Sequence, residues 1–328
     1  MTRRTFRAAL LLYLAATPAA AQPNWAPPVV MTDPAPDGER VEQDGLLGNW
    51  YPATERRAPA ILLLGGSEGA LSTGAAQIAT ALQRQGFAVL HLSYFRGPGQ
   101  SPSLELVPLE LFDRALAWIK KQPGVDPDRI GVVGNSKGAE AALLLASRNP
   151  AVKAVVTGVP SHVAWPGVVW DGTWGVMPKA SWSVAGQPVP VVPYGAFDPA
   201  GGIRSVYDNG LKALDQHADA IIPVERSRAP MLLVCGEQDT LWPSCPMARD
   251  IAERMVEAGG FKVEVLDYPE AGHFAFGPPI DPSSPFYPRL GASGGTIEGN
   301  AQARADSWPQ VVAFLRTAMS SQESRIQR

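Results

Sequence analysis

The chain has 328 residues, 45% hydrophobic and 18% charged, which is enough for one large α/β domain or two small ones. The formal net charge is −3 and no basic run follows the N-terminus, so the electrostatic features of a nucleic-acid-binding protein are absent from the sequence. Glycine and proline, 32 residues each, indicate many turns and long loops and argue against a helical bundle.

The first 21 residues have the pattern of an export signal. A basic segment over 1–7 precedes an apolar run over 8–16, and three alanines at 19–21 form a small-residue cleavage site. The apolar run is too short to cross a membrane. Arg3 and Arg4 fit a twin-arginine signal and an ordinary secretory signal equally well. We therefore expect a periplasmic or secreted protein with no integral membrane span.

Apolar strands and amphipathic helices alternate after an N-terminal extension over 22–60, whose residues 41–51 predict an early strand or a hairpin. Strands are predicted at 61–64, 87–92, 129–133, 152–156, 230–235 and 261–266. Helices are predicted at 75–85, 106–121, 139–147, 246–258 and 301–319. This alternation predicts an α/β fold with a mostly parallel central sheet and helices on both faces, over residues 61–319, before a tail over 320–328.

One long insertion, about 158–229, interrupts the alternation and carries four of the nine tryptophans. Long loops in compact domains are usually functional or disordered, and the tryptophans argue against disorder. A lid or pocket wall for an apolar substrate and a small satellite core are equally compatible with this composition. Trp170, Trp174 and Trp242 are the candidate substrate-pocket residues.

Residues 134–138 read Gly-Asn-Ser-Lys-Gly between a predicted strand and a predicted helix. In such a turn the flanking glycines let the strand and helix approach, and the serine side chain points outward. A serine hydroxyl is a weak nucleophile until a neighbouring base takes its proton. Ser136 is therefore the candidate nucleophile, with a plain helix N-cap as the alternative. The Lys137 side chain is expected to pair with Glu140 one turn on.

The base and the acid follow from chain order, which on this type of fold is serine, acid, histidine. His273 alone among the four histidines follows a well-placed acid. Asp239 comes just after a predicted strand, with Glu237 as a rival. Because the carboxyl ends of parallel strands meet at one edge of a sheet, Ser136, Asp239 and His273 are expected to form a Ser-Asp-His triad there.

A second Gly-x-Ser-x-Gly pattern, over 65–69, follows the first central strand and has no helix directly behind it. On this type of fold the corresponding loop supplies one amide of the oxyanion hole, and the residue after the nucleophile supplies the other. We therefore expect the backbone N–H groups of Ser67 and Lys137, helped by Gly66, to bind the developing negative charge.

Cys235 and Cys245 would lie in an oxidising compartment, where a disulfide and two unpaired thiols are both open. The histidines are scattered without metal-ligand spacing, and no phosphate-binding glycine loop is present in the sequence. The sequence therefore predicts no metal and no cofactor.

Several motifs together carry a family resemblance, at 83–90, 93–95, 107–112, 134–140, 241–244, 272–273, 294–295 and 301–308. The Pro-Leu-Glu and Ser-Lys-Gly segments are the most specific. This series resembles the C-terminal catalytic domain of acyl-CoA thioesterases and bile acid-CoA:amino acid N-acyltransferases, and more distantly the dienelactone hydrolases. The resemblance covers residues 60–318. It implies the α/β-hydrolase fold, with Ser136 as nucleophile, Asp239 as acid and His273 as base.

The sequence departs from that family at two points. Thioesterase members carry an N-terminal β-sandwich domain, for which 22–60 is too short, and the amidating members use cysteine where this chain has Ser136. Serine favours water as the acyl acceptor, and export argues against cytosolic coenzyme A thioesters. We therefore expect an exported serine hydrolase of a small-molecule ester or thioester. An acyltransferase to an amine and a non-catalytic binding protein of the same fold are the alternatives.

Overall fold

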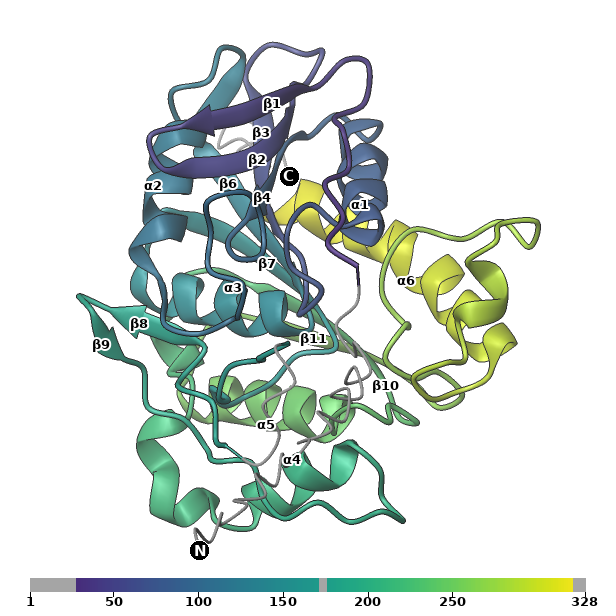
Figure 1. The fold of residues 1–328 in the computed structure, drawn as a ribbon. Coiled ribbons are helices and arrows are strands. Elements are labelled where there is room, and N and C mark those ends of the chain that lie inside the picture. The colour runs from purple at the N-terminus through teal and green to yellow at the C-terminus, as the bar shows by residue number, and fades with distance from the viewer. Residues whose placement is uncertain (1–27, 171–175, 321–328) are drawn as a thin grey trace, which may run out of the picture.

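A mixed eight-stranded sheet runs through the centre of the protein (Figure 1). The computed structural model describes residues 28–170 and 176–320. The strand order is β1-β2-β4-β3-β6-β7-β10-β11. The strands are β1 Glu39–Gln43, β2 Leu46–Tyr51, β3 Ala58–Leu64, β4 Ala88–Ser93, β6 Val125–Asn135, β7 Val152–Gly158, β10 Met231–Gly236 and β11 Val263–Tyr268.

Strands β1 and β2 form an antiparallel hairpin at one edge, and the other six strands are parallel. The hairpin turn is Asp44-Gly45, with positive φ values of 54° and 73°. An Asp-Gly pair is favoured in such two-residue turns because both positions need positive φ. Of the two possibilities that the sequence left for 41–51, the hairpin is therefore the one observed.

Helices cover both faces of the sheet, as the alternation predicted (Figure 1). α1 (Thr73–Gln83) and α6 (Ile297–Ala318) pack on one face. α2 (Glu110–Ile119), α3 (Lys137–Arg148) and α5 (Ser244–Glu257) pack on the other. Along β3 and β10, successive side chains alternate between a hydrophobic core on one face of the sheet and a second core on the other, so these strands are apolar at nearly every position. No helix in the described parts of the chain is long and apolar enough to cross a membrane.

The helix predicted over 106–121 begins only at Glu110, so that boundary was wrong. Val107–Pro108 instead forms the short strand β5, which pairs with β8 (Trp182–Val184), itself paired with β9 (Gln187–Pro188). The physical reason is Pro108, which disfavours the helical region for the residue before it and keeps that residue extended.

The insertion after β7 contains β8, β9, α4 (Arg204–Leu211) and two short 3₁₀ helices, η1 (Leu214–Ala220) and η2 (Val224–Arg226). A third 3₁₀ helix, η3 (Tyr287–Arg289), lies between β11 and α6. Trp165 is fully buried and packs with Val163, Val192 and Ala220 in a separate small core. Trp182 is also fully buried and belongs to the main core. These two tryptophans therefore have a packing role.

Candidate active site

Ser136 stands on a strained turn between β6 and α3, with φ 53° and ψ −119°. Positive φ is unfavourable for a residue with a side chain and is retained where the surroundings enforce it. A Cβ atom on Gly134 would lie 2.1 Å from the Gly138 carbonyl oxygen, and one on Gly138 would lie 2.2 Å from the Leu64 carbonyl oxygen. Only glycine fits at either position, so strand and helix approach closely around the serine.

His273 joins Ser136 to Asp239 through two hydrogen bonds. Its Nε2 lies 3.0 Å from Ser136 Oγ, and its Nδ1 lies 2.9 Å from Asp239 Oδ2. All three residues are buried, with relative exposures of 9% for the serine, 7% for the histidine and 1% for the aspartate. The structure thus brings the three expected residues into one hydrogen-bonded series at the carboxyl edge of the sheet.

The loop after β10 holds the Asp239 carboxylate through its second oxygen. Asp239 Oδ1 accepts hydrogen bonds from the backbone N–H groups of Leu241 at 2.9 Å and Trp242 at 3.3 Å. The rival acid, Glu237, instead pairs with Arg249 at 2.6 Å, and this pairing raises the pKa of the arginine. The local backbone therefore leaves Asp239 Oδ2 directed at the histidine.

The loop that carries His273 is held by Asn300 and Ser293, which sequence reasoning did not identify. The Gly272 N–H donates to Asn300 Oδ1 at 3.0 Å, and the His273 N–H donates to the Ser293 carbonyl at 3.0 Å. Gly294 pairs with Asp239 in an isolated bridge, and its φ of 92° requires glycine. The consecutive glycines at 294 and 295 were the available sequence signal for this contact.

The loop over 65–69 lies beside the nucleophile, since a Cβ on Gly66 would be 3.3 Å from Ser136 Cβ. The Gly66 N–H donates to Glu68 Oε1 at 3.2 Å, so in this conformation it is not available to an oxyanion, which differs from the expectation for Gly66. Lys137 is the first residue of α3, and the first backbone N–H groups of a helix have no acceptor within the helix, so the Lys137 N–H can serve an anion. Ser67 and Lys137 remain the two candidate donors.

The three candidate pocket tryptophans differ in position. Trp170 is half-buried and its Nε1 donates to the Ser67 carbonyl at 3.2 Å, so it lies beside the candidate oxyanion loop. Trp242 is 2% exposed, donates to the Val159 carbonyl and packs edge-on against the His273 ring at 5.9 Å. These contacts place it beside the candidate base, with its side chain almost wholly buried. Trp174 lies outside the described residues.

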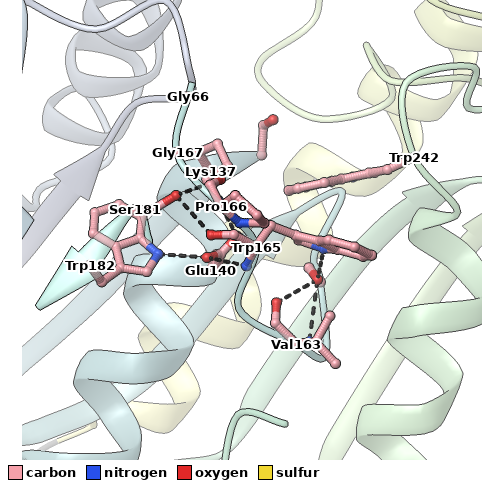
Figure 2. Close-up of polar contacts among 12 residues, drawn as sticks. Gly66, Lys137, Glu140, Val163, Trp165, Pro166, Gly167, Ser181, Trp182 and Trp242 are labelled. Atoms are coloured by element: carbon pink, nitrogen blue, oxygen red, sulfur yellow. Dashed lines mark hydrogen bonds and ion pairs between the residues drawn. The ribbon is translucent and has the colours of Figure 1, made fainter. Parts of the chain in front are cut away.

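An ion pair is buried in the first turn of α3, which begins at the residue after the candidate nucleophile (Figure 2). Lys137 Nζ lies 2.6 Å from Glu140 Oε2, and the two side chains are 2% and 0% exposed. The other oxygen, Glu140 Oε1, accepts hydrogen bonds from the Trp165 backbone N–H at 3.1 Å and from Trp182 Nε1 at 2.6 Å. Burial lowers the pKa of Lys137 and raises that of Glu140, and their mutual attraction opposes both shifts.

Cys235 and Cys245 form a disulfide with a Cα–Cα distance of 5.1 Å, and both are fully buried. The bridge connects the end of β10 to the start of α5. It therefore closes the loop on which Asp239 lies.

Comparisons with known proteins agree with this architecture. Residues 107–321 match the family model described as BAAT / Acyl-CoA thioester hydrolase C terminal. The chain is 28% identical over 261 residues to acyl-coenzyme A thioesterase 3 of Mus musculus, covering 76% of this chain and 56% of that protein. The chain spans about half the length of the curated relatives it matches.

Solved structures show the same fold at low sequence identity. An α/β hydrolase from a Medee basin deep-sea metagenome library superposes with a TM-score of 0.52 at 15% identity, covering 87% of this chain and 98% of that chain. A protein assigned as a dienelactone hydrolase from Klebsiella pneumoniae gives 0.51 at 16% identity, covering 85% and 96%. The fold predicted from the sequence, that of the α/β hydrolases, is therefore confirmed.

Proposed function

This chain belongs to the BAAT / acyl-CoA thioester hydrolase C-terminal family, and on that premise we propose that it is a serine hydrolase that cleaves a carboxylic ester or thioester through an acyl-enzyme. One observation carries the proposal: Ser136 Oγ, His273 and Asp239 form an unbroken hydrogen-bonded series, with the serine on a strained turn. A nucleophile, a base and an orienting acid in this order are what acyl transfer from an ester requires.

In the proposed reaction, His273 Nε2 takes the proton from Ser136 Oγ as the oxygen attacks the substrate carbonyl. The oxyanion then forms beside the backbone N–H groups of Ser67 and Lys137, whose donors favour negative charge in the transition state. The Asp239 carboxylate keeps the proton of His273 on Nδ1 and stabilises the imidazolium. The imidazolium then protonates the leaving alcohol or thiol, and water releases the acyl group through the same steps in reverse.

The substrate class is supported from two directions. The curated relatives named acyl-coenzyme A thioesterases favour a thioester. The leader-like N-terminus favours a substrate outside the cytosol, where coenzyme A thioesters do not occur. A serine nucleophile favours water as the acceptor over an amine. We therefore propose hydrolysis as the reaction. Whether the substrate is an ester or a thioester is decided by assaying both classes.

We also propose that the protein is exported through the leader over 1–21, to the periplasm or beyond. The buried Cys235–Cys245 disulfide supports this proposal, because disulfides persist mainly in oxidising compartments. Fractionation of cells that express the full chain tests it. A product that remains cytoplasmic with its first 21 residues intact would contradict it.

A fluorophosphonate probe tests the catalytic proposal directly. Wild-type protein is expected to be labelled, Ser136→Ala to remain unlabelled, and Ser101→Ala, a change at an exposed serine, to be labelled like wild type. The same three proteins are then assayed against p-nitrophenyl esters and acyl-CoA thioesters of graded chain length. Folded wild-type protein that is neither labelled nor active would indicate a binding protein. Amide formation with a competing amine would indicate an acyltransferase.

A further inference from the structure

The buried pair of Lys137 and Glu140 is not explained by stability alone. Lys137 follows Ser136 directly, and Glu140 lies one turn further along α3. Removing two charges from water has a large desolvation cost, and apolar side chains of similar size often stabilise a protein as well or better. The position of this pair, in the helical turn that begins at the candidate nucleophile, suggests a role in the chemistry.

The pair is linked to the candidate oxyanion loop through aromatic side chains. Glu140 Oε1 accepts a hydrogen bond from Trp182 Nε1 (Figure 2), and the Trp182 ring packs against the Tyr94 ring at 5.7 Å. The Tyr94 hydroxyl in turn donates to the Gly65 carbonyl at 2.6 Å. Two packed rings, those of Trp182 and Tyr94, therefore connect the Glu140 carboxylate to this loop.

The pair is linked to the candidate base by a second series of rings. Glu140 also accepts from the Trp165 backbone N–H, and the Trp165 ring packs edge-on against Tyr207 at 4.9 Å. Tyr207 packs against Trp242 at 5.6 Å, and Trp242 packs against His273 at 5.9 Å. The Glu140 carboxylate thus lies where the supports of the oxyanion loop and of the histidine meet.

We propose that the Lys137 ammonium is a positioning and charge-compensating group. It keeps Glu140 ionised for its two tryptophan N–H donors, and it cancels a negative charge that would oppose the oxyanion. The N–H groups at the start of a helix favour an anion, and an uncompensated carboxylate in the same turn reduces that preference in a low-dielectric interior. This inference rests on the proposed function of Ser136 and concerns the Lys137 side chain, whereas its backbone N–H is a candidate oxyanion donor.

Among the described residues, the other titratable groups that interact with Glu140 are three phenols, those of Tyr94 after β4, Tyr194 in the insertion and Tyr207 in α4. Burial raises the pKa of each, to about 12 for Tyr207, so they stay neutral between about pH 6 and pH 9. Glu68 faces Tyr94 from the glycine loop. Within 28–170 and 176–320, Lys137 is the cation that lowers the pKa of Glu140.

The first variant is Lys137→Met, which keeps the backbone amide and removes the ammonium. For p-nitrophenyl ester hydrolysis we expect kcat to fall at least about 10-fold at alkaline pH, with KM within about twofold of wild type. The loss should deepen as the pH rises, because burial raises the pKa of Glu140 and its uncompensated carboxyl ionises only toward alkaline pH.

The second variant is the double change Lys137→Met with Glu140→Gln, which removes both charges. The glutamine oxygen still accepts the two tryptophan N–H groups, so we expect kcat within about threefold of wild type and no added pH dependence. The matched control is Arg148→Met at the other end of α3, where the guanidinium pairs with Asp113 at 3.4 Å on the surface. This control is expected to leave kcat and its pH profile unchanged.

Two results would overturn the inference. One is a folded Lys137→Met protein whose kcat stays within about twofold of wild type at every pH. The other is a double variant that is as slow as the single variant or folds poorly, which would assign the pair a purely structural role. If the Lys137→Met protein fails to fold, the inference is tested on the double variant alone: it is supported by a folded protein with kcat within about threefold of wild type, and overturned by a slower or poorly folded one. Wild-type protein that neither hydrolyses the ester nor reacts with fluorophosphonate would instead refute the proposed function.

Discussion

Replacing Asp239 by asparagine changes one atom in the proposed triad and has two competing outcomes. In the first, the amide oxygen keeps the Oδ1 position, where the Leu241 and Trp242 N–H groups require an acceptor at 2.9 and 3.3 Å. The amide NH₂ then faces His273 Nδ1, which must become an acceptor. The ring proton moves to Nε2, and the histidine can no longer take the proton of Ser136.

In the second outcome, the asparagine is flipped, and its oxygen accepts from His273 as the carboxylate did. Its NH₂ then faces the two backbone donors, which lose their acceptor. Each unsatisfied buried N–H costs about 1–3 kcal/mol, so the flipped form is disfavoured by about 2–6 kcal/mol. Each step of about 1.36 kcal/mol changes the ratio of the two forms tenfold, so the flipped form, which is the one able to catalyse, makes up between about one part in 30 and one part in 10⁴ of the protein.

We therefore expect Asp239→Asn to lower kcat by about 30-fold to 10⁴-fold while the fold is retained. Steady-state hydrolysis of a p-nitrophenyl ester measures kcat, and thermal unfolding verifies the fold. Asp267→Asn, at an exposed carboxylate near the end of β11, is the matched control and should retain wild-type kcat. A folded Asp239→Asn protein with more than about a tenth of wild-type kcat would refute the assignment of Asp239 as the orienting acid.

Three further predictions concern stability, each measured by urea unfolding. Gly138→Ala places a Cβ 2.2 Å from the Gly65 carbonyl oxygen and should lower the free energy of unfolding by at least about 3 kcal/mol. A variant as stable as wild type would contradict the close approach of backbone around the Ser136 turn. Burial lowers the pKa of His91 to about 3, so below about pH 6.5 the unfolded state binds more protons than the folded state. As the pH falls from 6.5 to 5, this histidine should therefore lower the free energy of unfolding by about 1.5–2 kcal/mol. His91→Leu should flatten that slope, and an unchanged slope would exclude His91 as its source. Changing both Cys235 and Cys245 to alanine should lower the free energy of unfolding by about 2–3 kcal/mol, because the disulfide no longer closes its short loop in the unfolded chain. Equal stability of the reduced and oxidised wild-type proteins would contradict this prediction.

Local signals predicted the order of strands and helices and the turn at Ser136. Buried strands are apolar at nearly every position, and helices have apolar positions at a period of 3.6, so both patterns can be detected without knowledge of neighbouring segments. The requirement for Gly134 is also local, since a Cβ there would meet the backbone of Gly138, whereas a Cβ on Gly138 would meet Leu64 and Gly65 at the end of another strand. Chain order then limited the candidate base to His273.

Long-range contacts required the tertiary structure. Asn300 supports the His273 loop across 28 residues of sequence, and Trp182 donates to Glu140 across 42. No short-range periodicity encodes such pairs, because they depend on how the insertion and α6 pack on the sheet. For the same reason the sequence could not distinguish Trp170, which lies beside the candidate oxyanion loop, from Trp242, which is buried against the His273 ring.

The sequence by itself determined the fold class, the position of Ser136 and a single compatible histidine, because these depend on local conformation and on chain order. Only the tertiary structure decided that Glu237 is paired elsewhere and that the Gly66 amide is occupied. It also decided that the expected pairing of Lys137 with Glu140 occurs in the interior of the protein. Burial, and the loss of water that accompanies it, is a property of the packed molecule, and it makes that ion pair a candidate part of the chemistry.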